Sequence, residues 1–137
     1  MEKSQKTETI ESILKKTGLT YNVQQGFFST IWKISSAKKI NVIITGEVHP
    51  DWIHILCNIG PMNDFLNLDP KLLLRLNNSI IGCKLAMDRD LNLICSSEIW
   101  YDKISEEVLK NQITQVVNMV SLFYNHLEKE NLKLDST

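Results

Sequence analysis

The sequence predicts an α+β fold in which helices pack against a five-stranded, mostly antiparallel sheet, in the order α-β-β-β-α-β-β-α. Two kinds of apolar spacing carry this prediction: five segments alternate with the period of a strand, and three repeat with the period of a helix. Short turns join the first three strands, as in an antiparallel meander. With 137 residues, 43% of them hydrophobic, we expect one domain over residues 1–137 with a single core.

The first half of the chain supplies a helix and three strands. A short apolar stripe predicts a helix that ends near Lys16, where Gly18 provides the left-handed residue that commonly stops a helix. A polar lead-in follows at Asn22–Gly26. Period-two alternation then predicts three strands, at Phe27–Ser35, Ile40–Val48 and Trp52–Ile59. The turns that join them are Ala37-Lys38-Lys39 and His49-Pro50-Asp51.

The second half supplies a helix, a hairpin and a long closing helix. Asp69-Pro70 has the N-cap and first-turn pattern of a helix that reaches about Ile81. Two strands follow, joined by a polar turn, at Cys83–Asp88 and Leu93–Ile99. The closing helix is predicted over Ile104–Leu127, with Ser105 as its N-cap.

The closing helix is apolar over a wide arc. One continuous seam consists of Leu109, Ile113, Val116, Val120, Phe123 and Leu127. A second stripe of Val108, Met119 and Leu122 lies beside it and needs another neighbour. We therefore expect a homodimer whose interface includes either this stripe or the leucine-rich segment that begins with Leu72 and Leu73 and runs to Ile81.

Composition excludes several classes of partner. Fifteen basic and sixteen acidic residues give a net charge of −1, so no overall field attracts nucleic acid or an anionic membrane. No segment approaches the ~20 apolar residues that span a bilayer, and the first residues lack a signal-peptide pattern. The three cysteines, Cys57, Cys83 and Cys95, form no paired motif and are predicted to be reduced core thiols. We expect a cytoplasmic protein.

No motif indicates a reaction, a cofactor or a metal. His49, Asp51 and His54 are close in sequence, but we interpret them as a surface turn because zinc sites usually show paired, regularly spaced ligands. Nucleophilic catalysis needs a thiol or hydroxyl beside a histidine, whereas the cysteines share the register of core residues. Glycine-rich phosphate-binding loops do not occur. The sequence therefore predicts no catalytic residues, no cofactor and no metal site.

Apolar residues also occupy the strand positions that alternation directs away from the main core. They are Phe27, Ile31, Ile43, Trp52, Leu56, Ile94 and Trp100. Either helices cover both faces of the sheet, with the N-terminal helix lying on this one through Ile10, Ile13 and Leu14, or the second face binds a protein. For the second case the candidate partner-binding residues are Trp52, Leu56, Trp100, Phe27 and Ile31, since tryptophan anchors commonly dominate interfaces.

Three segments resemble a known family. They are Leu72-Leu73-Leu74-Arg75-Leu76-Asn77-Asn78, the hairpin from Cys83-Lys84-Leu85-Ala86-Met87-Asp88 into Asn92-Leu93-Ile94-Cys95, and Ile104-Ser105-Glu106-Glu107-Val108-Leu109. Together they are similar to the YbjN family, which shares the fold of type III secretion chaperones. Leu91 stands where that hairpin usually carries glycine, and Trp100 where a small residue or proline is usual.

This resemblance implies a non-catalytic, chaperone-like protein-binding module that works as a homodimer on a client of unknown identity. Two other classes stay open: a nucleic-acid-associated regulator and an enzyme of unrecognised type. His54 and a cysteine facing each other in a pocket would favour the enzyme, whereas a continuous apolar groove without titratable residues would favour the binding module.

Overall fold

A computed structural model describes residues 2–24, 26–34 and 40–135 of the chain, with side chains described for 9–24, 26–34 and 40–129. The helices are α1 (Glu2–Thr17), α2 (Pro70–Ser79) and α3 (Glu106–Asp135), and two 3-10 turns are η1 (Met62–Phe65) and η2 (Tyr101–Lys103). The strands are β1 (Tyr21–Gln24), β2 (Phe27–Ile34), β3 (Ile40–Val48), β4 (Trp52–Pro61), β5 (Lys84–Met87) and β6 (Asn92–Trp100).

All strands join one antiparallel sheet in the order β1-β2-β3-β4-β6-β5. The predicted α+β class is confirmed, but the sheet has six strands rather than five. The additional strand is β1, which occupies part of the segment predicted to be a polar lead-in. It is a four-residue edge strand paired with β2. The predicted turn at Ala37-Lys38-Lys39 and the strand end at Ser35 lie outside the described residues.

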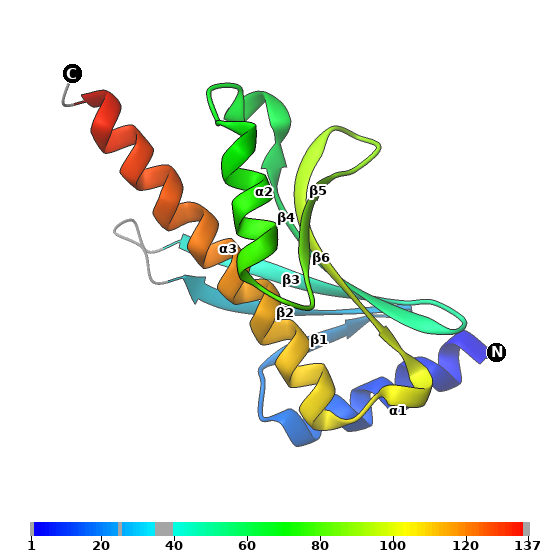
Figure 1. The fold of residues 1–137 in the computed structure, drawn as a ribbon. Coiled ribbons are helices and arrows are strands. Elements are labelled where there is room, and N and C mark those ends of the chain that lie inside the picture. Colours follow the sequence, from blue (N-terminus) through cyan, green and yellow to red (C-terminus); the bar gives the residue numbers. More distant parts are fainter. Residues whose placement is uncertain (1, 25, 35–39, 136–137) are drawn as a thin grey trace.

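The helices all pack on one face of the sheet (Figure 1), where α3 runs diagonally across the strands with α1 against it at one end and α2 beside it. One core cluster contains buried residues of every helix, including Ile10 and Leu14 of α1 and Leu76 of α2. The strands contribute the inward side chains of their alternating pattern, such as Phe28 and Ile55. A single core therefore lies between the helices and this inner face of the sheet.

Three predicted boundary signals are present in the structure. Gly18 after α1 has φ +77°, in the left-handed region that stops helices. The Ser105 hydroxyl accepts a hydrogen bond from the Val108 amide at 3.1 Å, as an N-cap does. Asp69 caps α2 in the same way, by accepting from the Lys71 amide at 2.9 Å.

The β5–β6 hairpin turn contains Leu91 at a position with a left-handed backbone. Leu91 adopts φ +63°, which costs a non-glycine residue of order 1–3 kcal/mol. Asp88 holds the turn, because its carboxylate accepts hydrogen bonds from the Asp90 and Asn92 amides, each at 2.9 Å. The turn therefore keeps its shape through side-chain hydrogen bonds despite the unfavourable backbone of Leu91.

None of the helices in the described ranges is both long enough and apolar enough to span a lipid bilayer.

Candidate functional site

The second face of the sheet, which we call the outer face, carries the candidate partner-binding residues. Helix α1 does not cover it, since Ile10 and Leu14 are buried in the core on the inner face. None of the seven outward apolar residues named from the sequence belongs to that core cluster, although Ile94 is buried on its own side of the sheet, at 9% exposed. The sequence left two explanations open. The first, that helices cover both faces of the sheet, is therefore wrong for the described part of the chain.

Two tryptophans form a patch at the end of the outer face near the β3–β4 turn. Trp52 on β4 and Trp100 on β6 are directly opposite each other in the register, which places their Cβ atoms ~4.5–5.5 Å apart. Trp100 exposes 56% of its surface, while Trp52 is half-buried. An open pocket of about 410 Å³ adjoins this tryptophan patch and is lined by Pro50, Asp51, Trp100, Tyr101, Asp102 and Lys103.

Two isoleucines form a second patch toward the other end of the same face. Ile31 on β2 and Ile43 on β3 are also opposite each other in the register. They expose 66% and 58% of their surface. Because directly opposed side chains on one face of a sheet are in contact distance, the two residues form one apolar surface, the isoleucine patch.

A mixed band of polar and apolar residues separates the two patches. Phe27, Glu47, His54 and Glu98 follow one another across β2, β3, β4 and β6 as successive register partners. The next row contains Thr45, half-buried Leu56 and buried Ser96. The outer face is thus two apolar patches on either side of a mixed band, and not the continuous apolar surface expected from alternation alone.

The predicted dimer residues fall into two groups. Val108 and Leu122 on α3 and Leu72 and Leu73 on α2 are partly buried against the core cluster. Met119, by contrast, is 0% exposed. The chain's own elements cover it, so its place in a dimer surface is a correction to the sequence prediction. Within the predicted leucine-rich segment, the exposed apolar residues are Leu74 at 71% and Ile81 at 90%.

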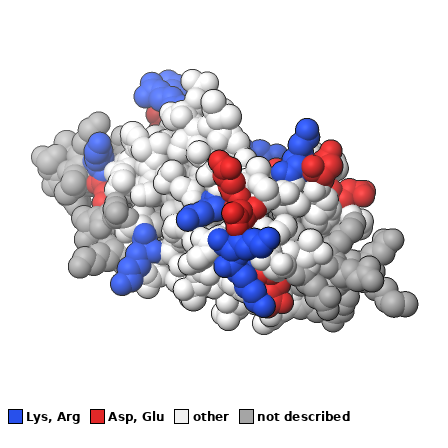
Figure 2. All heavy atoms as spheres, turned by 90° about the horizontal axis from the view of Figure 1, so that it is seen from below, with Lys and Arg blue, Asp and Glu red and all other residues white. Residues whose placement is uncertain are grey.

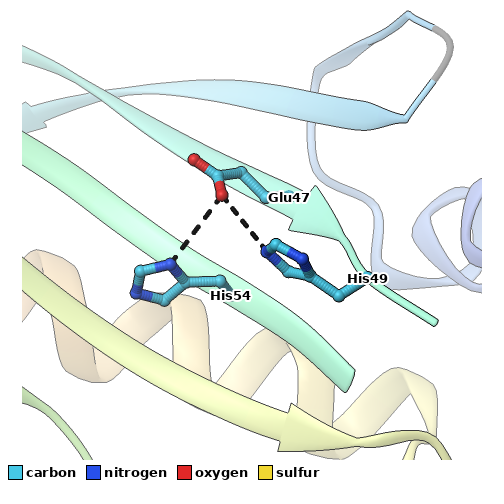
Figure 3. A group of neighbouring side chains, drawn as sticks. All are labelled: Glu47, His49 and His54. Carbon is cyan, nitrogen blue, oxygen red and sulfur yellow. Dashed lines mark hydrogen bonds and ion pairs between the residues drawn. The ribbon is translucent and has the colours of Figure 1, made fainter. Parts of the chain in front are cut away.

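A compact group of polar side chains lies between β3 and β4 on the outer face (Figure 3). It consists of Glu47, His49 and His54, whose nearest ligand atoms all lie within 4.8 Å of one another. Asp51, which the sequence placed near the two histidines, is not part of it, and Glu47 takes its place. The sequence did contain a signal for Glu47. If the two strands are joined by a tight hairpin that pairs Val48 with Ile53, then Glu47 lies opposite His54.

The three cysteines lie on the inner side of the sheet, away from these histidines. Cys57 and Cys95 are buried and opposite each other on β4 and β6, and burial raises the pKa of Cys57 to about 12. Cys83 packs against the core cluster but is only partly buried, so it is the least enclosed of the three predicted core thiols. A hydrogen bond from the Cys95 thiol lowers the pKa of Cys83 and raises that of Cys95, whose burial acts in the same direction.

Helices on one face of a six-stranded antiparallel sheet, with no described helix on the other, give this chain the fold of the type III secretion chaperones and of YbjN. No protein-family model matches the sequence, and no curated protein matches it either. The likeness is therefore one of structure.

Three solved structures illustrate it. YbjN from E. coli has a TM-score of 0.61 at 13% identity, over 88% of this chain and 92% of that chain. A chain of the HopA1–SchA chaperone–effector complex has a TM-score of 0.57 at 13% identity, over 85% and 93%. The complex of the Yersinia pestis type III secretion chaperone SycH with a fragment of YscM2 gives 0.52 at 13% identity, over 83% and 95%.

Proposed function

We propose that this protein is a non-catalytic, chaperone-like module that holds an extended segment of a client protein on the outer face of its sheet. The observation that supports this most strongly is the pair of apolar patches on a face that no described helix covers. Exposed apolar patches of this kind mark sites of protein interaction. Structural neighbours in complex with their protein partners, such as HopA1–SchA, support the same class of function.

The distance between the patches suggests what the client segment looks like. Trp52, His54 and Leu56 follow one another along one side of β4, and each defines a row of register partners across the sheet. The isoleucine patch lies in the row after that of Leu56. Each row advances ~6.6 Å, so the patches are about 20 Å apart. An extended client would therefore place two apolar side chains roughly six residues apart, with polar or basic residues facing the carboxylates of Glu47 and Glu98.

The arrangement of charge favours a protein partner over nucleic acid. Figure 2 shows basic and acidic side chains interspersed on the face in view, with no continuous basic stripe. Binding to a phosphate backbone relies on such a stripe of lysine and arginine.

The placement of the histidines also disfavours the enzyme hypothesis. His54 is on the outer face, and the thiols of Cys83 and Cys95 lie against backbone carbonyls of Gln115 and Val116 on α3. Catalysis by a thiol and a histidine needs the two within hydrogen-bond reach.

We also propose that the module is a homodimer and acts in the cytoplasm. The exposed Leu74 and Ile81 give α2 and its exit an apolar side that a second copy could cover. The three free thiols fit a reducing compartment.

Client capture tests the function. The wild-type chain and a Trp52→Ala/Trp100→Ala variant would be immobilised and exposed to native cytosol, and the retained proteins identified. We expect the variant to lose clients while its free energy of unfolding falls by less than the ~3 kcal/mol that truncation of a core tryptophan costs, because neither tryptophan packs against the core cluster. A loss of ~3–5 kcal/mol with capture intact would instead make both tryptophans packing residues and refute the proposal.

A further inference from the structure

Two imidazoles and a carboxylate converge on the outer face at the β3–β4 hairpin. Glu47 Oε2 lies 3.3 Å from His49 Nε2 and 3.9 Å from His54 Nδ1. Figure 3 shows both rings directed at this one oxygen, from the end of β3, the turn and the start of β4. The side chains are accessible as well as close, with His54 22% and Glu47 44% exposed.

We propose that Glu47, His49 and His54 form a binding site for a divalent transition-metal ion of the zinc class. Imidazole and carboxylate donors suit Zn²⁺, Cu²⁺ and Ni²⁺, whereas Mg²⁺ and Ca²⁺ prefer oxygen donors alone. Zinc bonds of ~2.0–2.1 Å in a tetrahedron put ligand atoms about 3.3 Å apart. The ligand atoms of the three residues are separated by 3.3 and 3.9 Å, and no two of them are more than 4.8 Å apart. Small side-chain rotations would bring them to the tetrahedral spacing.

The surrounding structure holds the ligands in place before a metal arrives. Glu47 and His54 are direct register partners on two central strands. The His49 ring stacks on Trp52, with centroids 4.3 Å apart and planes at 12°, and the His49 amide donates to the Trp52 carbonyl at 2.9 Å. Ligands supported in this way lose less conformational freedom on binding, which favours affinity.

A further carboxylate is positioned to act as an outer-shell partner. Glu98 on β6 is the register partner of His54 on the side away from Glu47. Metal-bound histidines commonly donate their second ring N–H to a carboxylate, which fixes the tautomer and the ring orientation. Three protein ligands leave one position of a tetrahedral ion open to water or to a donor from another molecule.

Calorimetric titration of the untagged, chelator-treated chain with zinc chloride tests the site. We expect one equivalent of zinc to bind. His49→Ala and His54→Ala should each weaken zinc binding at least ~10-fold, because loss of an outer-shell partner alone costs that much and these residues are direct ligands. His126→Ala removes the third histidine, on α3, and should bind zinc like the wild type. Circular dichroism of each variant shows whether it is folded.

Two further variants separate this site from other sources of binding. Cys83→Ser should leave affinity unchanged, and binding lost in Cys83→Ser but retained in His49→Ala would assign zinc to the thiols and overturn the proposal. Glu47→Gln keeps the size of the side chain and removes the charge, so it should weaken binding as the histidine variants do. Absence of saturable zinc binding, or equal binding by all variants, would also overturn it.

Discussion

The core has no room for a side chain at position 46, which glycine occupies. Gly46 is the register partner of Phe28 on the inner face, and a Cβ atom at this position would overlap the Phe28 ring. We expect Gly46→Ala to lower the free energy of unfolding by ~1–3 kcal/mol, as overpacking does. Urea denaturation measures it.

A double variant provides the control for this expectation. Phe28→Leu in the Gly46→Ala background should recover part of the loss, because the smaller side chain frees the contested space. Purely additive effects of the two substitutions would show that the Phe28 ring is not what Gly46 accommodates.

The cysteines should differ sharply in reactivity. The thiolate is the reactive form, so the lowered pKa and partial exposure of Cys83 favour its modification, whereas burial protects Cys57 and Cys95. We expect a thiol-specific disulfide reagent to label one cysteine of the native protein quickly and all three only after unfolding. Cys83→Ser should abolish the fast phase. Rapid native labelling that persists in Cys83→Ser would contradict the assignment.

At the scale of elements, sequence patterns located the three α-helices and all strands but one in the described part of the chain. The exception, β1, contains only two apolar residues, Tyr21 and Val23, which is too little alternation to distinguish a strand from a polar connection. It forms because β2 offers a hydrogen-bonding edge, and that edge exists only after folding. The apolar arc of α3 was likewise visible from the sequence. The sequence did not reveal which part of that arc neighbouring elements cover, as the complete burial of Met119 shows.

The candidate site was predictable only in part, for the same reason. Alternation placed Trp52, Trp100 and Ile31 on the outward face, and the structure agrees that they are outside the core. Whether they touch depends on strand order and register, which pair Trp52 with Trp100 across β4 and β6. The group of Glu47 with the two histidines depends on register as well, so spacing along the chain did not reveal it.

Asn77 on α2 protects one edge of the sheet. Its amide accepts from the Leu85 N–H at 2.6 Å and donates to the Leu85 carbonyl at 3.1 Å, as a neighbouring strand would. An unprotected edge strand is open to pairing with another chain. We expect Asn77→Ala to cost ~1–3 kcal/mol through the unpaired Leu85 groups, measured by denaturation. Asn78→Ala, at the exposed neighbouring position, is the matched control, and equal effects would refute the edge-capping role.

At the scale of the whole molecule, the homodimer can be tested by sedimentation. Leu74 and Ile81 are exposed on the α2 side of the molecule, and a stable interface would bury ~800 Å² per partner. We expect a dimer at micromolar concentration and a monomer for Leu74→Glu/Ile81→Glu, since buried charges without partners are costly. Ile43→Glu, on the outer face, should stay dimeric. A wild-type monomer would exclude this assembly, and a dimer unaffected by the α2 substitutions would move the interface elsewhere.

We propose different roles for the two sides of the molecule: the outer face would bind a client, and the α2 side would bind a second copy. Site-directed photo-cross-linking in the native cytosol separates them. A photoreactive benzoylphenylalanine replaces Ile43, Trp100 or Leu74 in turn, and mass spectrometry identifies each product. We predict that Ile43 and Trp100 cross-link to the same client protein, while Leu74 cross-links to another copy of the chain. Client cross-links from Leu74 with none from Ile43 and Trp100 would contradict the placement of client binding on the outer face.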